Sequence, residues 1–201
     1  MTIAPIGVLA LLAWVTSTLM VPCERDEGTT GSPGGAAGAR VTSGSPGSAQ
    51  GAAGGIHWSA PSRWTEQPAR PMRIATYTVP PAPGDSEAAE CAVYYFGKGQ
   101  GGGVDDNVTR WAAQFEGSPK AERSAKEVNG LKVNLVQVAG AYLAPGGPAM
   151  QSQGRKENYR LHGAIVEAPE GAVFFKCTGP ARTVAAAHTE FESLVASLAK
   201  K

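Results

Sequence analysis

Apolar and polar positions divide the chain into three regions. Residues 1–22 are strongly apolar and carry no charged side chain, whereas residues 23–55 are mostly Gly, Ala, Ser, Thr and Pro. Residues 56–201 instead show short runs with the periods of strands and helices, and they are numerous enough for a packed core. The pattern predicts a signal or anchor segment, a disordered tether and a single folded domain, in that order.

The folded region predicts an antiparallel sheet built from hairpins. Its strand-like runs are separated by turn residues and cover residues 72–79, 90–96, 127–128, 131–142, 159–167 and 172–178. The run 90–96 is apolar on both faces, which is typical of a strand in the middle of a sheet. Asn129-Gly130 and Pro169-Glu170-Gly171 are typical of tight turns between antiparallel strands. In the run 131–142 the apolar phase switches after Leu135, which indicates a β-bulge or a strand that crosses the edge of the core.

Two amphipathic helices complete the predicted domain. The apolar stripe of the first helix is formed by Val108, Trp111, Ala112 and Phe115. We expect Asp105, Asp106 or Asn107 to cap its start. A second stripe, from Ala187 to Leu198, predicts a helix that runs to the C-terminus with the two final lysines at its end. The expected fold class is α+β, an antiparallel β-sheet flanked by two amphipathic helices.

The apolar segment 1–22 is typical of a secretory signal or an N-terminal anchor, so we expect export to the cell envelope. Cys23 follows directly, at the place of the lipidated cysteine of bacterial lipoproteins. Pro22 stands where such signals usually have a small residue, and no Lys or Arg precedes the apolar run. Three alternatives stay open: a lipoprotein anchored through Cys23, an uncleaved helical anchor, or a cleaved and secreted protein. As a flexible coil, residues 23–55 would hold the domain away from the membrane on its periplasmic side.

Charge and motif spacing argue against several function classes. The chain has 18 Lys and Arg against 17 Asp and Glu without a basic stripe, so no nucleic acid is an expected partner. Gly97-Lys98-Gly99-Gln100-Gly101-Gly102 matches a dinucleotide-binding pattern, but Asp105 and Asp106 would repel a pyrophosphate at the next helix start. We interpret this segment as a connecting loop and predict no cofactor. None of the common catalytic motifs occurs, so no catalytic residue is predicted.

The histidines and the remaining cysteines suggest a structural role. His57, His162 and His188 stand far apart in the sequence and in different elements, so no metal site is predicted. Cys91 and Cys177 both fall in predicted strands. We favour two buried thiols, and the alternative is a disulfide, which needs Cα atoms within roughly 7 Å of each other.

The tryptophans can serve either packing or binding. We expect Trp58, Trp64 and Trp111 in the core, because each can bury a large apolar area. If Trp58 and Trp64 were exposed beside Arg63 and Arg73, these four residues would form a binding face rich in the side chains of interface hot spots.

Scattered residues of the domain carry a resemblance to a known group of proteins. They are Met72-Arg73, Ala75, Tyr77, Val93-Tyr94-Tyr95-Phe96-Gly97, Asn107, Arg110-Trp111, Gln114-Phe115, Lys176, Thr178-Gly179-Pro180, Phe191, Leu194-Val195 and Ser197-Leu198. Over roughly residues 56–198 the chain resembles uncharacterised bacterial predicted lipoproteins, and more distantly it is similar to the PsbP-type fold. The resemblance implies an α/β/α sandwich around an antiparallel sheet and a role in binding or assembly, and it brings no catalytic residue with it.

The sequence as a whole predicts an exported, membrane-tethered and non-catalytic binding or assembly module. Its partner is unknown, either an envelope protein or a small ligand. One alternative is a hydrolase or lyase with residues on several loops, for which the sign is a pocket with two titratable groups in opposed environments. Another is a small-molecule carrier, for which the sign is an empty apolar cavity.

Overall fold

The computed structural model describes residues 48–143 and 154–201. The predicted signal or anchor segment 1–22, Cys23 and most of the predicted tether lie outside the described residues. Within the described ranges, no helix combines the length and the apolar character needed to cross a membrane.

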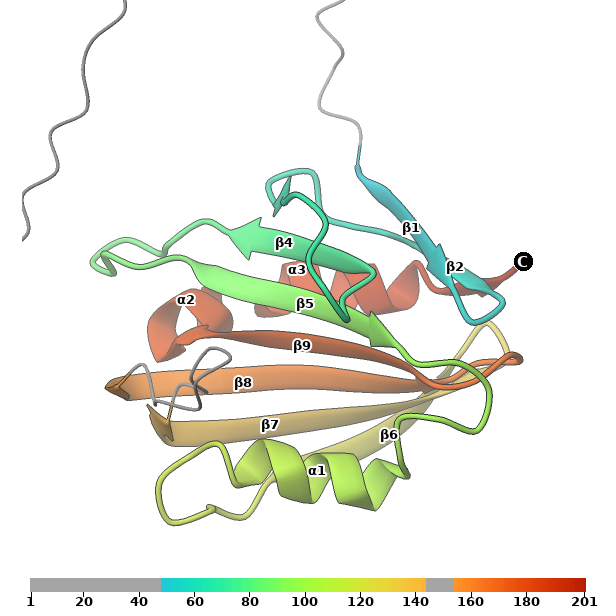
Figure 1. The fold of residues 1–201 in the computed structure, drawn as a ribbon. Coiled ribbons are helices and arrows are strands. Elements are labelled where there is room, and N and C mark those ends of the chain that lie inside the picture. Colours follow the sequence, from blue (N-terminus) through green and yellow to red (C-terminus); the bar gives the residue numbers. More distant parts are fainter. Residues whose placement is uncertain (1–47, 144–153) are drawn as a thin grey trace, which may run out of the picture. The chain divides into compact units, whose positions relative to one another are not determined.

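The main element of the described chain is one antiparallel sheet of seven strands (Figure 1). The strands are β3 (Thr65–Glu66), β4 (Ala75–Val79), β5 (Ala89–Tyr95), β6 (Glu122–Val128), β7 (Leu131–Leu143), β8 (Arg155–Glu167) and β9 (Val173–Pro180). Their spatial order is β3-β4-β5-β9-β8-β7-β6. The central position predicted for residues 90–96 is confirmed, since β5 lies between β4 and β9. The protein is thus a mixed α+β protein with a large antiparallel sheet.

Both predicted tight turns are confirmed. Asn129 and Gly130 join β6 to β7 with φ of 49° and 73°, and a type I′ turn requires positive φ at both central residues. Between β8 and β9, the N–H of Gly171 donates to the carbonyl of Ala168 at 3.1 Å.

A second, three-stranded sheet among the described residues corrects the predicted start of order at residue 56. It consists of β1 (Gln50–Ala53), β2 (Ile56–Ser59) and β10 (Ala199–Lys200), with β2 in the middle. β1 lies in the predicted tether and has few apolar atoms of its own. It is held by backbone pairing with β2 and by the packing of Trp58 against Gly51, where a Cβ would lie 2.2 Å from the indole ring.

The C-terminal region also differs from the single helix predicted there. It forms two short helices, α2 (Ala181–Ala186) and α3 (His188–Ala196), followed by β10. Lys200 therefore pairs with Ile56 of β2, and it does not extend a helix end. The last residues form the strand β10 because the open edge of β2 offers hydrogen-bond partners to their backbone groups. Without this pairing, these groups would have to bond to water.

Alternate side chains of the large sheet enter two separate apolar clusters. Phe174 of β9 belongs to the same cluster as Trp111 of α1 (Val104–Ala112). Its neighbour Phe175 belongs to the cluster that contains Phe191 of α3. Figure 1 shows α1 in front of the sheet, with α2 and α3 behind it.

The two clusters explain the switch of apolar phase in β7. Val133 belongs to the cluster on the α3 side, whereas Val136 and Val138 belong to the cluster on the α1 side. Pairing with β8 continues unbroken through this region, and the irregularity lies between Gly140 and Tyr142. The prediction of a bulge at the switch is therefore wrong. The two ends of β7 contribute apolar side chains to opposite faces of the sheet.

α1 is capped differently from the prediction. Gly103 is its N-cap residue, and its N–H donates to the carboxylate of Asp106 at 3.2 Å. Asn107 is buried within the helix, and its amide nitrogen donates to the carbonyls of Gly101 and Gly103 at 2.9 and 2.8 Å. None of the three predicted polar residues is the N-cap residue, but Asp106 contributes to the cap from the third helical position, whereas Asp105 pairs with Arg123.

Gly163 of β8 marks a close approach of α1 to the sheet. A Cβ at this position would lie 2.3 Å from Cζ3 of Trp111. We expect Gly163→Ala to lower the free energy of unfolding by about 1–3 kcal/mol, because Trp111 must leave its packed position. Denaturant titration followed by circular dichroism measures this change.

The Trp111→Leu background provides the control for this contact. There the added methyl group meets a smaller side chain, so Gly163→Ala should cost less than in the original chain. The same cost in both backgrounds would show that the substitution acts through something other than Trp111.

Candidate functional site

The tryptophans lie in the core, so the predicted binding face does not form. Trp58 is 1% exposed, and its indole N–H donates to the hydroxyl of Tyr77 at 3.1 Å. Trp64 is 5% exposed and donates to the carboxylate of Glu190 at 2.9 Å. Trp111 is also buried, so the expectation of three core tryptophans is confirmed.

The two arginines of that predicted face are engaged in ion pairs. Arg63 donates two hydrogen bonds to Glu190, at 2.7 and 2.8 Å, and this pairing lowers the pKa of the Glu190 carboxyl. Arg73 donates to Glu90 at 2.6 Å. The proposed face of two tryptophans and two arginines is therefore wrong, because its aromatic rings pack inward.

Cys91 and Cys177 lie directly opposite each other on β5 and β9. Both are buried as free thiols. A hydrogen bond with Cys177, together with burial, raises the pKa of the Cys91 thiol. A protonated thiol is a poor nucleophile, so the pair behaves as small apolar side chains, although its register offers the proximity that a disulfide needs.

The glycine-rich loop after β5 adopts backbone conformations that residues other than glycine rarely adopt. Gly97, Gly99, Gly101 and Gly102 all have positive φ. The amide of Asn107 holds the Gly101 carbonyl, as described above, and so fixes the loop to α1. The loop thus forms one wall of a cavity.

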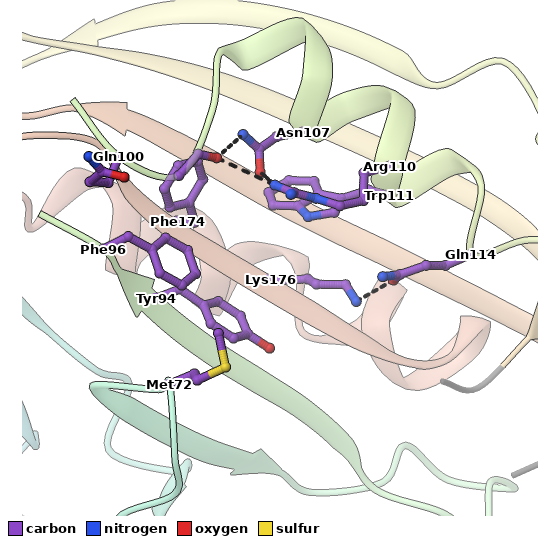
Figure 2. A pocket seen from close by; sticks show the side chains of 11 residues that line it. Met72, Tyr94, Phe96, Gln100, Asn107, Arg110, Trp111, Gln114, Phe174 and Lys176 are labelled. Atoms are coloured by element: carbon purple, nitrogen blue, oxygen red, sulfur yellow. Dashed lines mark hydrogen bonds between the residues drawn. The ribbon is translucent and has the colours of Figure 1, made fainter. Parts of the chain in front are cut away.

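This cavity, of about 550 Å³, lies on the α1 side of the sheet (Figure 2). Its volume falls in the range of small-molecule binding sites. The lining comes from the segment before β4, from β5 and the glycine-rich loop, from α1 and the turn after it, and from β9. The residues are Met72, Tyr94, Phe96, Gln100, Gly101, Asn107, Arg110, Trp111, Gln114, Phe174 and Lys176.

Aromatic rings form the apolar part of the cavity. Phe96 stacks with Tyr94, with ring centroids 6.2 Å apart, and lies 6.0 Å from Phe174. Phe96 is 39% exposed and Met72 is 76% exposed, so apolar surface remains open to solvent at the rim. Figure 2 shows the side chain of Met72 beside Tyr94 and Phe96. Met72 holds this position with φ of 63°, a conformation that costs energy for residues other than glycine.

Lys176 places a positive charge in this aromatic setting. Its ammonium group donates a hydrogen bond to the side-chain oxygen of Gln114 and lies 5.7 Å from the ring centroid of Tyr142. Burial, the main cause, and the charges of Arg73 and Arg110 lower the pKa of Lys176 to about 8. Among the described residues, no carboxylate forms an ion pair with Lys176.

Arg110 adds a second positive charge to the lining. Its guanidinium donates to the side-chain oxygen of Asn107 and, at 3.4 Å, to the carbonyl of Gly101. Both acceptors are neutral, and within the described chain Arg110 has no ion-pair partner. The cavity therefore carries positive charge that the protein itself does not neutralise.

Sequence reasoning did not identify this cavity. One signal was available: Lys176 is a charged residue inside the apolar strand Val173-Phe174-Phe175-Lys176-Cys177, and such a residue is costly unless it has a function or a partner. The other lining residues come from distant segments, and no spacing rule brings them together.

The histidines are placed differently from the predicted separation. His57 is exposed on β2, but His162 of β8 and His188 of α3 are stacked, with ring centroids 5.1 Å apart. Burial, with a smaller effect of His188, lowers the pKa of His162 to about 4, so this imidazole is neutral at pH 7.

The lowered pKa of Lys176 makes stability depend on pH. The folded pKa of about 8 lies below the value of 10.5 for an unburied lysine, so the unfolded chain binds more protons between these values. The cost of the buried charge is fully present below pH 8 and disappears as the pH rises to about 10.5. We expect Lys176→Met to be more stable than the original chain at pH 7, by about 1–3 kcal/mol, and to lose this advantage by pH 10.5.

Denaturant midpoints measured between pH 7 and pH 10.5 test this expectation. Lys132→Met is the matched control, because Lys132 is exposed and pairs with Glu167. A Lys176→Met advantage that stays constant with pH would show that Lys176 titrates normally in the folded protein.

Comparison with known proteins assigns no family to the chain. The chain matches no protein-family model, and no curated protein matches it. The resemblance to predicted lipoproteins with a PsbP-type fold stays a prediction, and the function is argued from the cavity.

Proposed function

We propose that the chain is an exported, membrane-tethered and non-catalytic binding module that takes a small anionic ligand with a flat apolar body. The observation that carries this proposal is the cavity of about 550 Å³ with aromatic walls and the unneutralised cations Lys176 and Arg110. The apolar segment 1–22, with Cys23 after it, supports export and anchoring.

The cavity's chemistry determines the class of ligand. Tyr94, Phe96 and Phe174 offer ring faces and edges against which a flat apolar group can stack. An anionic group beside Lys176 would form a charge-assisted hydrogen bond in a partly desolvated site, where such bonds are strong. A carboxylate or sulfonate on an aromatic or polyene body therefore fits better than a neutral or cationic molecule.

A small ligand accounts for the structure better than an envelope protein does. The large apolar side chains exposed among the described residues are Met72, Ile74, Phe96 and Leu143, and two of them line the cavity. Exposed apolar surface is thus concentrated where a concave site exists, which favours a molecule that enters the cavity.

The finer fold assignment is part of this proposal. An α/β/α sandwich of the PsbP type is supported by the position of Trp111 from α1 on one face of the sheet and Phe191 from α3 on the other. Such an arrangement would leave the cavity on a single face, open beside α1.

A matched pair of ligands tests the proposed function. In the segment 48–201, which contains both apolar clusters, 2-naphthoate should bind at least about tenfold more tightly than the neutral 2-naphthamide, since a hydrogen bond to a charged group contributes about 1.5–3 kcal/mol. Lys176→Met should remove most of this difference, and Lys132→Met should not. Calorimetry, or quenching of the tryptophan fluorescence to which Trp111 in the cavity contributes, measures the affinities.

Two results would contradict the proposal. One is equal affinity of the original segment for the two ligands, and the other is a preference for the anion that survives in Lys176→Met. Circular dichroism on each variant verifies that the fold is intact.

A hydrolase or lyase is the second candidate, and one observation favours it. Burial lowers the pKa of Lys176 to about 8 and raises the pKa of the neighbouring Tyr142 to about 12, so one apolar environment moves the two pKa values apart. An enzyme would return its bound molecule chemically altered, in a manner that Lys176→Met abolishes. A binding module would return the molecule with its mass unchanged.

The anchor is tested separately from the cavity. In a bacterial host, the full chain should incorporate radiolabelled palmitate, and Cys23→Ala should lose the label while keeping the cavity intact, because a thiol at position 23 is the proposed acceptor. Equal labelling of both chains, or of neither, would rule out lipidation at this cysteine.

A further inference from the structure

A second group of chemically active side chains lies on the α3 side of the sheet. His162, His188 and Glu192 present ligand atoms that all lie within 4.8 Å of one another. His162 comes from β8, whereas His188 and Glu192 are four residues apart on α3, a spacing that places them on the same helix face. All three line a cavity of about 290 Å³.

The imidazole of His162 packs between two other rings and makes no hydrogen bond to the described residues. It is 3% exposed, and its ring lies 4.3 Å from the centroid of Phe191 and 5.1 Å from that of His188. Across the described residues, neither imidazole makes a hydrogen bond. His162 lines the cavity described above, so a metal ion in that cavity can take the lone pair of this imidazole.

The carboxylate of Glu192 can supply the third ligand atom. Its Oε2 pairs with the ammonium group of Lys126, and among the described residues Oε1 has no ion-pair partner. Glu122, Arg123 and Gln137 also face this cavity, and Arg160 lies close enough to influence His162. Because Arg123 pairs with Asp105 on its other side, part of the surrounding positive charge is neutralised.

We propose that His162, His188 and Glu192 form a binding site for a divalent transition-metal ion of the zinc class. Two imidazoles and one carboxylate are a common zinc ligand set, which leaves a fourth position for water. In tetrahedral geometry the ligand atoms would lie roughly 3.4 Å apart, and the three ligand atoms here all lie within 4.8 Å of one another. The two imidazole rings are 9° from parallel, and His188 is exposed, so its side chain is free to adjust when it binds a metal ion.

This site is independent of the proposed anion cavity. Gly163, which pairs with Lys176, approaches Trp111 on the α1 side of β8. The adjacent His162 therefore points to the opposite side, where it contacts Phe191. Either site can exist without the other.

Zinc titration of the full chain in mild detergent tests the proposal. We expect the original chain to bind one more equivalent of zinc than His188→Ala by calorimetry, and Glu192→Gln to weaken this site at least about tenfold. His57→Ala is the matched control, because it removes an exposed histidine from a different element and should bind zinc as the original chain does. Zinc bound by Cys23 is common to all four chains and cancels in the comparison.

The thermal midpoint provides a second readout. Zinc should raise the midpoint of the original chain and of His57→Ala more than that of His188→Ala, since only a ligand bound to the folded state stabilises it. The proposal would be overturned if the original chain and His188→Ala bound zinc with the same stoichiometry and affinity. It would also be overturned if His57→Ala lost as much zinc binding as His188→Ala. His57 and His188 lie outside the buried core. Thermal melting without zinc verifies that each variant folds.

Discussion

The structure depends on the alternation of side chains along β9, which lies between β5 and β8 and has packed groups on both of its faces. Phe174 and Lys176 point toward α1, whereas Phe175 and Cys177 point toward α3. A shift of one residue in this strand would exchange the two sets, so its register with β5 and β8 fixes the content of both faces. One of the alternating positions that face α1 is Lys176, so this register also places a positive charge in the cavity on that side.

Short-range signals in the sequence predicted the parts of the fold that local physics determines. The turn Asn129-Gly130 needs positive φ at both residues, and few sequences besides this pair meet that need. The run 90–96 has no polar face, so it must lie inside a sheet. The buried tryptophans were predicted from size alone, because an indole ring that stays in water forgoes a large stabilisation.

The features that the sequence did not predict depend on contacts between separate elements of the fold. β1 has little apolar surface, and its order comes from β2, which lies across a tight turn and offers a large indole ring to Gly51. His162 and His188 are 26 positions apart and meet only because α3 packs over β8. The cavity combines the glycine-rich loop, α1 and β9, so its existence depends on tertiary packing and cannot be derived from periodicity.

The small sheet determines how the described chain would respond to a force on its N-terminal side, such as the proposed tether would transmit. β1 is an outer strand that begins at Gln50 and pairs antiparallel with β2. Tension on the N-terminal end of β1 would break the β1–β2 hydrogen bonds sequentially, while β2 keeps its pairing with β10. β1 would then detach first, while the seven-stranded sheet, in which β1 has no strand partner, would keep its pairing.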